Sequence, residues 1–348
     1  MARSWGFWTC YKLDILKRYL DAFTTATKNR SPAKRVVYLD LFAGEPENVE
    51  RETQNLISGS ASIALDIDDP PFSHLCFFEL EPKAAKLRAA ISAEFPDRDL
   101  VVYPGNCNDT IHKALADLRA ADAGWAPTFA FIDPNGPHYT WRTLEALAAH
   151  KGHKAKTKVE LWMLFPDPLF ARMLPCTGDV RPSDNAAITA MFGDPSWHAI
   201  WKTKLDDKIN ARDARDEYVN LMRWRLECVL GYRWTHQLEI RNTGGTPLYH
   251  LIFATDSKVG HDIMTHLYNQ AASEFPAMAQ AARSLRFRRR QEAHGQYDLF
   301  STLDPEGQDA LEASHPPAPA AAGPQLLYVH ESPDEPRAHD PHTCPYCD

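Results

Sequence analysis

The fold class follows most directly from one stretch of the chain, Val36-Val37-Tyr38-Leu39-Asp40-Leu41-Phe42-Ala43-Gly44. Residues 36–41 form a short and mostly apolar run, which is typical of a parallel strand buried on both faces of a sheet. A glycine follows at the carboxyl end of this strand, where a nucleoside cofactor approaches the backbone closely. The stretch therefore favours a Rossmann-type nucleotide site, with an ordinary strand-to-loop corner as the alternative.

Strand and helix signals alternate in the residues around this stretch, which indicates βαβ units and a parallel sheet. The predicted strands are 75–79, 100–103, 128–132 and 159–165, and the predicted helices are 8–28, 59–66, 82–94, 108–121 and 140–149. Short helices over 176–210, a helix over 212–230 and a hairpin over 233–254 follow. Parallel strands followed by a hairpin are the layout of the seven-stranded methyltransferase fold. We therefore predict an α/β, Rossmann-like, doubly wound and mostly parallel seven-stranded sheet of the class I S-adenosylmethionine (SAM) methyltransferase type, with an inserted helical region and a helical C-terminal extension.

Four segments are predicted along the chain. An N-terminal helix lies within 1–35, and the Rossmann-like domain spans 36–255 with a helical insertion at about 168–210. A helical extension with a basic run covers 256–300. Residues 301–348 hold nine prolines and nine acidic residues against one arginine, so we expect a disordered tail. This tail accounts for the net charge of −8, because the first 300 residues carry 37 basic and 37 acidic side chains.

Composition and motif content narrow the class of protein. Apolar residues make up 44% and charged residues 24% of the chain, as in ordinary globular proteins. The chain has no run of about 18 apolar residues, so we expect no membrane span. No secretory leader is expected either. The seven cysteines are mostly scattered, which favours a reduced, cytoplasmic setting. We find no P-loop, nucleophile elbow, H-E-x-x-H or kinase signature.

Three strand ends supply candidate cofactor ligands. An acid at Glu79 can accept hydrogen bonds from both ribose hydroxyls, with a solvated strand end as the alternative. It lies 39 residues after Asp40, beyond the roughly 20 of the short motif, because a predicted loop over 45–58 intervenes. Asn106 or Asn108 could bind an adenine amino group or cap the next helix. The predicted cofactor-binding residues are Asp40, Phe42, Ala43, Gly44, Glu79, Asn106 and Cys107.

The fourth strand runs into the predicted catalytic loop, Asp133-Pro134-Asn135-Gly136. An acid and the following backbone carbonyl can accept hydrogen bonds from an exocyclic amine and point its lone pair at an activated methyl group, and such orientation supplies much of the rate. Amine-directed methyltransferases carry a base-stacking aromatic residue where this chain has Gly136, so Tyr139 or Trp141 is expected to replace it. A β-turn is the alternative, since D-P-N-G is a strong turn sequence.

Two further clusters lie toward the C-terminus. A basic run could bind nucleic-acid phosphates, or it could be a solvated helix face or a dock for the acidic tail. This run consists of Arg283, Arg286, Arg288, Arg289 and Arg290. The second cluster offers ligand types suited to zinc, although its spacing is tighter than that of a zinc finger, and a redox C-x-x-C or no site at all are the alternatives. Its members are His339, His342, Cys344 and Cys347.

In the order and spacing of these motifs, the chain resembles the three-Cys-motif partner family over about residues 7–300. The shared features are Trp8-Thr9, Lys12-Leu13, residues 40–44, Gly59-Ser60, Phe78-Glu79, residues 105–108, residues 131–134 and residues 251–255. The resemblance implies a bacterial methyltransferase-like Rossmann domain encoded beside its partner, a radical-SAM-like protein with three clustered cysteines. Three positions depart from the family pattern, because Glu45-Pro46 replaces Pro-Gly, Asn106 replaces an aspartate and Asn135 replaces an aromatic residue.

The leading hypothesis is a SAM-dependent methyltransferase-like protein that acts on an amine of a nucleobase or nucleic acid, together with the three-cysteine partner. This chemistry needs no metal, because the sulfonium is already activated. The alternative is a catalytically degenerate Rossmann-fold scaffold or a nucleic-acid-binding partner protein, because all three departures fall at the predicted cofactor and substrate sites.

Overall fold

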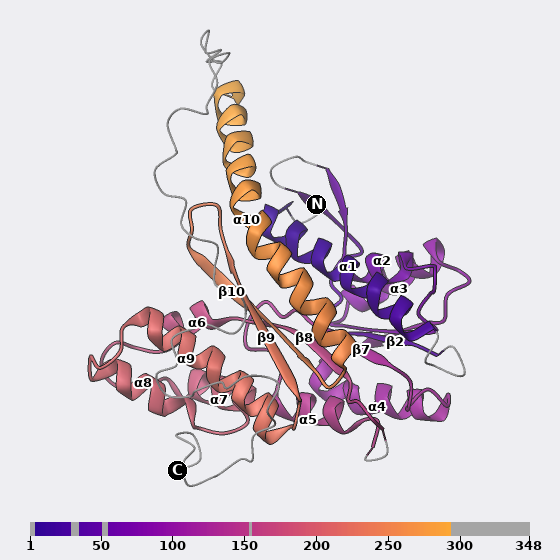
Figure 1. Cartoon of the computed structure of the whole chain (residues 1–348), viewed down its shortest axis with the longest axis horizontal. Helices are drawn as coiled ribbons and strands as arrows, with labels where there is room; N and C mark the ends of the chain where they lie inside the picture. Colours follow the sequence, from indigo (N-terminus) through magenta and orange to yellow (C-terminus); the bar gives the residue numbers. More distant parts are fainter. Residues whose placement is uncertain (1–3, 29–34, 51–54, 153–154, 294–348) are drawn as a thin grey trace.

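A computed structural model describes residues 4–28, 35–50, 55–152 and 155–293. Its centre is a seven-stranded sheet with the spatial order β6-β5-β2-β7-β8-β10-β9 (Figure 1). The strands are β2 (Val37–Asp40), β5 (His74–Glu79), β6 (Leu100–Pro104), β7 (Thr128–Ile132), β8 (Glu160–Phe165), β9 (Trp234–Arg241) and β10 (Pro247–Thr255). Each strand lies within about two residues of the position that its apolar run predicts.

The sheet is mostly parallel. Four pairs, β6–β5, β5–β2, β2–β7 and β7–β8, are parallel, whereas β10 runs antiparallel to both β8 and β9. The predicted hairpin therefore forms, and its second strand inserts between β8 and β9. An α/β fold with a mostly parallel seven-stranded sheet is confirmed.

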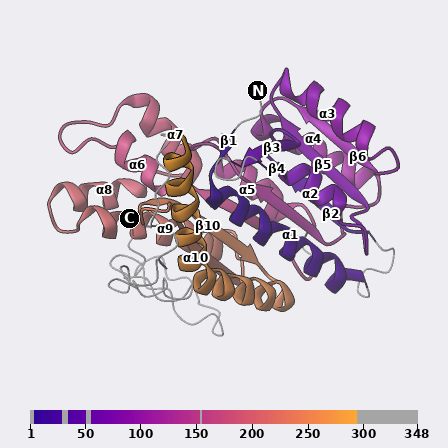
Figure 2. The same ribbon diagram turned by 90° about the horizontal axis from the view of Figure 1, so that it is seen from above.

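Helices cover both faces of the sheet, as period-two burial requires: Tyr38 faces one apolar cluster, and Val37 and Leu39 face the other. On the Tyr38 side lie α1 (Phe7–Lys28), α2 (Ser60–Asp66), α3 (Lys83–Glu94) and α10 (Lys258–Ala293). On the opposite side lie α4 (Cys107–Ala120), α5 (Trp141–Ala149), α6 (Asp167–Met173), α7 (Pro182–Phe192), α8 (Trp197–Leu205) and α9 (Ala211–Trp224). Figure 2 shows α1 and α10 crossing one side of the strands.

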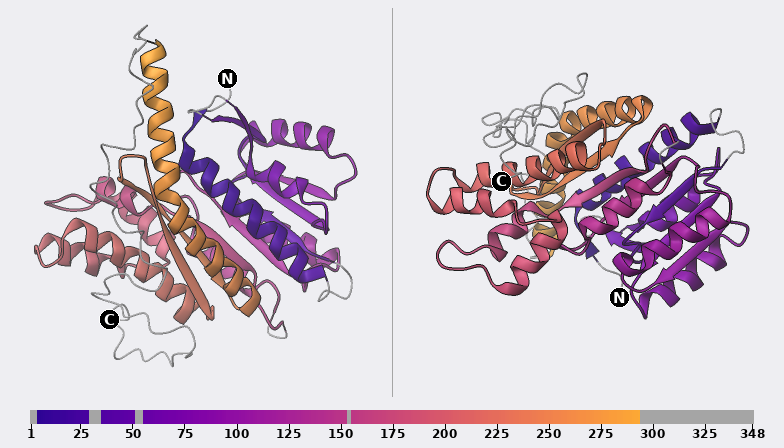
Figure 3. Two further views of the ribbon diagram at one scale, coloured as in Figure 1. Left: turned by 45° about the horizontal axis from the view of Figure 1, so that its top comes forward. Right: turned by 90° about the horizontal axis from the view of Figure 1, so that it is seen from below.

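The terminal helices are part of this layered body. Helix α1 packs beside α10 and against the sheet, and both helices contribute to one apolar cluster with Leu16, Tyr19 and Met264. Farther along α10, Phe275 contacts the ring of Phe7, and the last turns of the helix project beyond the sheet (Figure 3). The predicted tail over 301–348 lies outside the described residues.

The loop predicted over 45–58 is wrong in part, because it contains two strands. Strands β3 (Glu47–Glu50) and β4 (Leu56–Ser58) pair with each other, and β3 also pairs with β1 (Ser4–Trp5). These three strands form a separate small sheet. They are only two to four residues long and partly charged, so they lack the apolar run by which the other strands are recognised.

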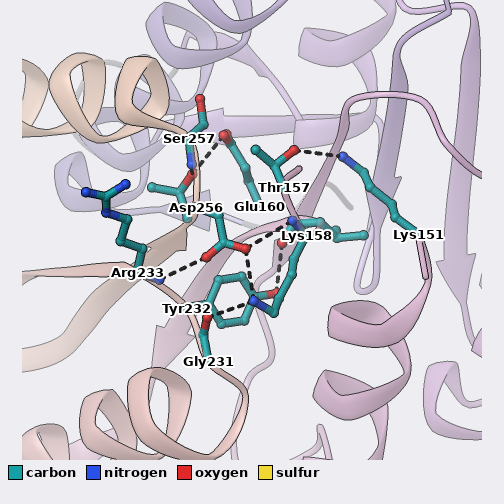
Figure 4. Close-up of polar contacts among 11 residues, drawn as sticks. Lys151, Thr157, Lys158, Glu160, Gly231, Tyr232, Arg233, Asp256 and Ser257 are labelled. Carbon is teal, nitrogen blue, oxygen red and sulfur yellow. Dashed lines mark hydrogen bonds and ion pairs between the residues drawn. The ribbon is translucent and has the colours of Figure 1, made fainter. Parts of the chain in front are cut away.

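Two clusters of polar side chains link the amino-terminal end of β8 to α1 and to the β9–β10 hairpin. The buried Glu160 carboxylate accepts hydrogen bonds from Tyr19 of α1 and from Thr255 at the end of β10. Next to it, Asp256 accepts bonds from the backbone N–H of Arg233, at 2.9 Å, and from Lys158 Nζ, at 3.0 Å (Figure 4). These contacts hold α1 and the hairpin to the parallel strands at the amino-terminal ends of the strands. The predicted site lies at the opposite, carboxyl ends.

We expect Gly260→Ala to lower the free energy of unfolding by about 1–3 kcal/mol, because overpacking a dense interior costs this much. A Cβ atom there would lie 2.6 Å from Glu160 Oε1 and 2.9 Å from the Tyr19 hydroxyl. The sign of this change in the free energy of unfolding is informative, because replacing glycine by alanine in a helix otherwise stabilises the protein by up to about 1 kcal/mol. Urea unfolding of both proteins measures the change. Ser273→Ala, at an exposed position of α10, is the control and should shift stability by less than about 0.5 kcal/mol; an equal or higher stability of Gly260→Ala would contradict the packing described.

Candidate functional site

A cavity of about 740 Å³ lies at the carboxyl ends of the parallel strands. The chain leaves β2 toward β5 on one side, and β7 lies on the other side of β2, so the strand order reverses at this point. Open α/β sheets bind ligands at such a topological switch point. The loops after β2 and β7 both line the cavity, with walls added by α1, the small sheet and the start of β10.

The cavity brings together most of the residues predicted from the sequence. Its lining includes Phe42, Ala43, Gly44, Glu79, Asn106, Cys107, Asp133, Pro134 and Asn135. Asp40 and Gly136 are the two predicted residues of these loops that do not line it. Residues from four separate strand ends therefore converge on one space, although their binding of a cofactor stays a prediction.

Glu79 organises the loop that follows β2. Its Oε2 accepts a hydrogen bond of 2.8 Å from the Gly44 backbone N–H, and its Oε1 accepts one of 2.9 Å from the Leu80 N–H. Gly44 has a φ of +67°, which glycine adopts without steric cost. A carboxylate offers about four acceptor positions, so each oxygen of Glu79 can still accept a hydrogen bond from a ligand hydroxyl.

Asp40 lies behind the cavity wall, so the prediction that it contacts the cofactor directly needs correction. Its side chain is fully buried, where Oδ2 accepts a hydrogen bond from the Tyr38 hydroxyl and Oδ1 accepts one from the Phe42 N–H. Burial raises its pKa to about 7, against the hydrogen bonds that lower it. Because side chains alternate along β2, Asp40 points to the same buried face of the sheet as Tyr38, and its hydrogen bond to the Phe42 N–H supports the loop that follows.

Of the two roles that the sequence left open for Asn106, the structure shows the helix cap, and the role as a cofactor ligand stays a prediction. Its Oδ1 accepts a hydrogen bond of 3.0 Å from the Asn108 N–H and so caps α4, and the residue also lines the cavity. Asn108 bridges to the neighbouring loop, because its side chain donates to the His138 carbonyl and accepts from the Thr140 N–H. On the cavity wall, burial raises the pKa of Cys107 to about 12, so its thiol stays neutral near pH 7.

An ion pair ties the predicted catalytic loop to α1. Lys12 Nζ contacts Asp133 Oδ2, and the two side chains are only 4% and 14% exposed. The ammonium group also lies 5.7 Å from the ring centroid of Tyr249. Lys12 was not among the predicted site residues. The available signal was a lysine within the amphipathic first helix, next to Leu13.

The prediction that Tyr139 or Trp141 stacks on a substrate base is wrong. Both side chains are buried in the core on the far side of the sheet, and neither lines the cavity. Trp141 begins α5 and packs under the guanidinium group of Arg225. The aromatic rings that do line the cavity are Trp8, Phe42, Phe78, His138 and Tyr249.

Two buried polar atoms on the cavity wall lack a hydrogen-bond partner among the described residues. They are Oδ1 of Asn48 and the hydroxyl of Tyr249. Burial, and then the nearby Asp133 charge, raise the pKa of Tyr249 well above its ordinary value, so this hydroxyl remains a donor. Leaving such a group unpaired costs about 1–3 kcal/mol, and a bound ligand could satisfy both.

Of the members of the two remaining predicted clusters, only Arg283 has a side chain that the structure describes, and this side chain does not line the cavity. Arg283 donates to the Thr243 carbonyl at the tip of the hairpin, and the side chains of Arg286, Arg288, Arg289 and Arg290 lie outside the described part, as do His339, His342, Cys344 and Cys347. Among described residues, no group of three or more His, Cys, Asp or Glu could hold a metal ion. No helix in the same ranges is long and apolar enough to cross a membrane.

Comparison with known proteins adds little about function. No family model matches the chain, and no curated protein matches it. Among solved structures, the fold is similar to that of protein LPL1258 from Legionella pneumophila str. Philadelphia 1, described under the family model DUF519. The two sequences are 12% identical, the match covers 74% of this chain and 92% of the other, and the TM-score is 0.40. A similarity of this size carries no argument about activity.

We expect Asp40→Asn to change how stability depends on pH. The folded protein holds the Asp40 proton up to a pKa of about 7, from an ordinary value of 3.8. Holding this proton therefore stabilises the folded protein fully below pH 4, and the stabilisation is lost as the pH rises to 7. Since an asparagine side chain cannot ionise, the variant should gain about 2–3 kcal/mol relative to the parent between pH 5 and pH 8. Urea unfolding at both pH values tests this, with the exposed Asp66→Asn as control. Parallel profiles for Asp40→Asn and the parent would count against the raised pKa.

Proposed function

We propose that the cavity binds SAM and that the protein transfers the methyl group to an amine of a nucleobase. The observation that carries the proposal is the convergence of Gly44, Glu79, Asn106 and Asp133 on one space at the switch point of the sheet. The insertion of β10 beside β8 as a reversed strand supports a sheet of the class I methyltransferase type. The resemblance to the three-Cys-motif partner family points the same way, and we propose its radical-SAM-like neighbour as the partner.

The residues around the β2 and β5 ends fit an adenosine cofactor. The two carboxylate oxygens of Glu79 retain acceptor capacity for ribose hydroxyls, and Gly44 allows close approach of the backbone. The exposed Leu80 at the cavity rim offers apolar surface to an adenine ring. Asn106 Oδ1 already accepts two hydrogen bonds from Asn108, so the Asn106 side chain can offer its Nδ2 as a donor to a ring nitrogen of adenine. SAM supplies a methyl group already activated by its sulfonium.

The residues around the β7 end fit an amine substrate. Asp133 and the Pro134 carbonyl accept hydrogen bonds from the amine and direct its lone pair, and alignment of this kind lowers the barrier substantially. As the new N–C bond forms and the C–S bond breaks, the amine loses a proton, which Asp133 can take. Lys12 fixes the position of this carboxylate. The rings of Trp8 and Tyr249 on the wall provide apolar surfaces for a planar base.

A scaffold without catalysis is the second candidate. One observation favours it: Asp133 already has an ionic partner in Lys12, so an amine would compete with an ammonium group for the same carboxylate. Each of the three departures from the family pattern puts a residue on the same cavity, namely Glu45, Asn106 and Asn135. In this case the protein would bind its partner, or nucleic acid through the arginine run, without methyl transfer.

The first test is cofactor binding by calorimetric titration with SAM. We expect Glu79→Ala to weaken binding by about tenfold or more, because it removes charge-assisted hydrogen bonds to the ribose. Glu94→Ala, an exposed carboxylate at the end of α3 that does not line the cavity, is the matched control and should bind as the parent does. No heat of binding to the parent at millimolar SAM would exclude the enzyme and leave the scaffold.

The second test follows labelled methyl groups from SAM to total RNA and DNA. Asp133→Ala should lose at least about 100-fold in rate, because it no longer orients the amine. That variant also leaves Lys12 buried without its partner, which costs stability. The double variant Lys12→Met/Asp133→Leu removes both charges and should fold about as stably as the parent, bind SAM and still transfer no methyl group. Transfer that persists in the double variant would move the reaction to other residues.

A further inference from the structure

Asn48 is a polar residue of the cavity that no sequence motif indicated. It lies on β3 of the small sheet and is 1% exposed, and its Oδ1 has no hydrogen-bond partner among the described residues. Its Nδ2 lies 3.5 Å from the Glu45 carbonyl oxygen. Exchange of the amide nitrogen and oxygen would bring two oxygens together, so the free acceptor is the one that faces away from Glu45.

The backbone around Asn48 keeps this acceptor in place. Asn48 pairs with Ile57 across the β3–β4 ladder. The Gly59 N–H donates to the Pro46 carbonyl at 2.7 Å, and a Cβ on Gly59 would lie 2.4 Å from the Glu45 carbonyl oxygen. The segment is therefore closed tightly against the start of α2, and the side chain cannot turn to solvent without opening the small sheet.

The groups around Asn48 favour a ligand with a cationic hydrogen-bond donor. Asn48 Oδ1 is a buried acceptor, and the carboxylate of Glu45, exposed at the rim of the same cavity, carries negative charge. A primary ammonium group can donate to the first and be attracted by the second. A neutral hydroxyl could donate as well, but it would gain nothing from the charge of Glu45.

We propose that Asn48 binds the ammonium group of the methionyl portion of SAM, an inference that rests on the proposed function. Glu79, which accepts a hydrogen bond from the Gly44 N–H, and Asn106, at the end of the neighbouring strand, suit the nucleoside. Glu45 follows Gly44 directly in the chain and leads into β3, which carries Asn48, and both residues line the same cavity. An amino-acid chain attached to the ribose therefore extends past Gly44 toward Asn48.

The experiment titrates the full chain with two nucleosides, S-adenosylhomocysteine and 5′-methylthioadenosine, of which only the first carries the amino-acid portion. We expect Asn48→Leu to weaken binding of S-adenosylhomocysteine by about tenfold and to leave binding of methylthioadenosine unchanged. Asn48→Asp keeps an acceptor and should restore binding of S-adenosylhomocysteine. Asn55→Leu, at an exposed position before β4, is the matched control and should bind both nucleosides as the parent does.

Thermal unfolding without ligand separates this role from a structural one. Because the acceptor is unpaired, Asn48→Leu should unfold at the same or a higher temperature than the parent. A lower midpoint, an equal loss of both nucleosides, or unchanged binding of S-adenosylhomocysteine overturns the proposal while leaving the proposed function standing. A parent that binds neither nucleoside overturns both.

Discussion

The ion pair between Lys12 and Asp133 is the contact that fixes the predicted catalytic carboxylate on the cavity wall. It joins the first turns of α1 to the loop after β7, across 121 residues of sequence. Removing one partner of a buried ion pair lowers the free energy of unfolding by about 3–5 kcal/mol, because the other charge stays buried without a partner. The pair therefore links α1, which packs on one face of the sheet, to the loop after β7, and α1 in turn carries Trp8 and Thr9 to the cavity wall.

Much of the fold could be predicted because buried parallel strands are apolar runs, and the runs at β2, β5, β6, β7 and β8 stand out from their surroundings. The convergence of Gly44, Glu79 and Asp133 was also predictable, since the carboxyl ends of parallel strands meet at the same edge of a sheet. The small sheet was not, because its strands are only two to four residues long, too short to show a period, and β3 carries two glutamates.

The side chains that sequence reasoning missed or misplaced depend on tertiary contacts. Lys12 lies on a helix that the apolar periodicity does predict, but no local pattern indicates that its ammonium group reaches the loop after β7. Tyr139 and Trp141 follow the catalytic loop closely, yet α5 turns them into the opposite core layer. Asp40 illustrates the period-two rule, because it points to the buried Tyr38 face whereas its neighbour Leu41 lines the cavity.

The unpaired atoms on the cavity wall bear on the choice between an enzyme and a scaffold. Buried acceptors and donors without partners cost about 1–3 kcal/mol each, and whole domains are stable by only about 5–15 kcal/mol. Asn48 and Tyr249 carry this cost on a wall that also holds Glu79 with free acceptor capacity. A scaffold that binds only through its outer surface gains nothing from such groups, and apolar side chains would fill the same volume more stably. A ligand that enters the cavity would offset this cost in the bound state, and this is the contribution that the proposed binding of a small polar molecule makes. The competition between Lys12 and an amine for Asp133 affects methyl transfer. It does not affect the binding of a small molecule in the cavity.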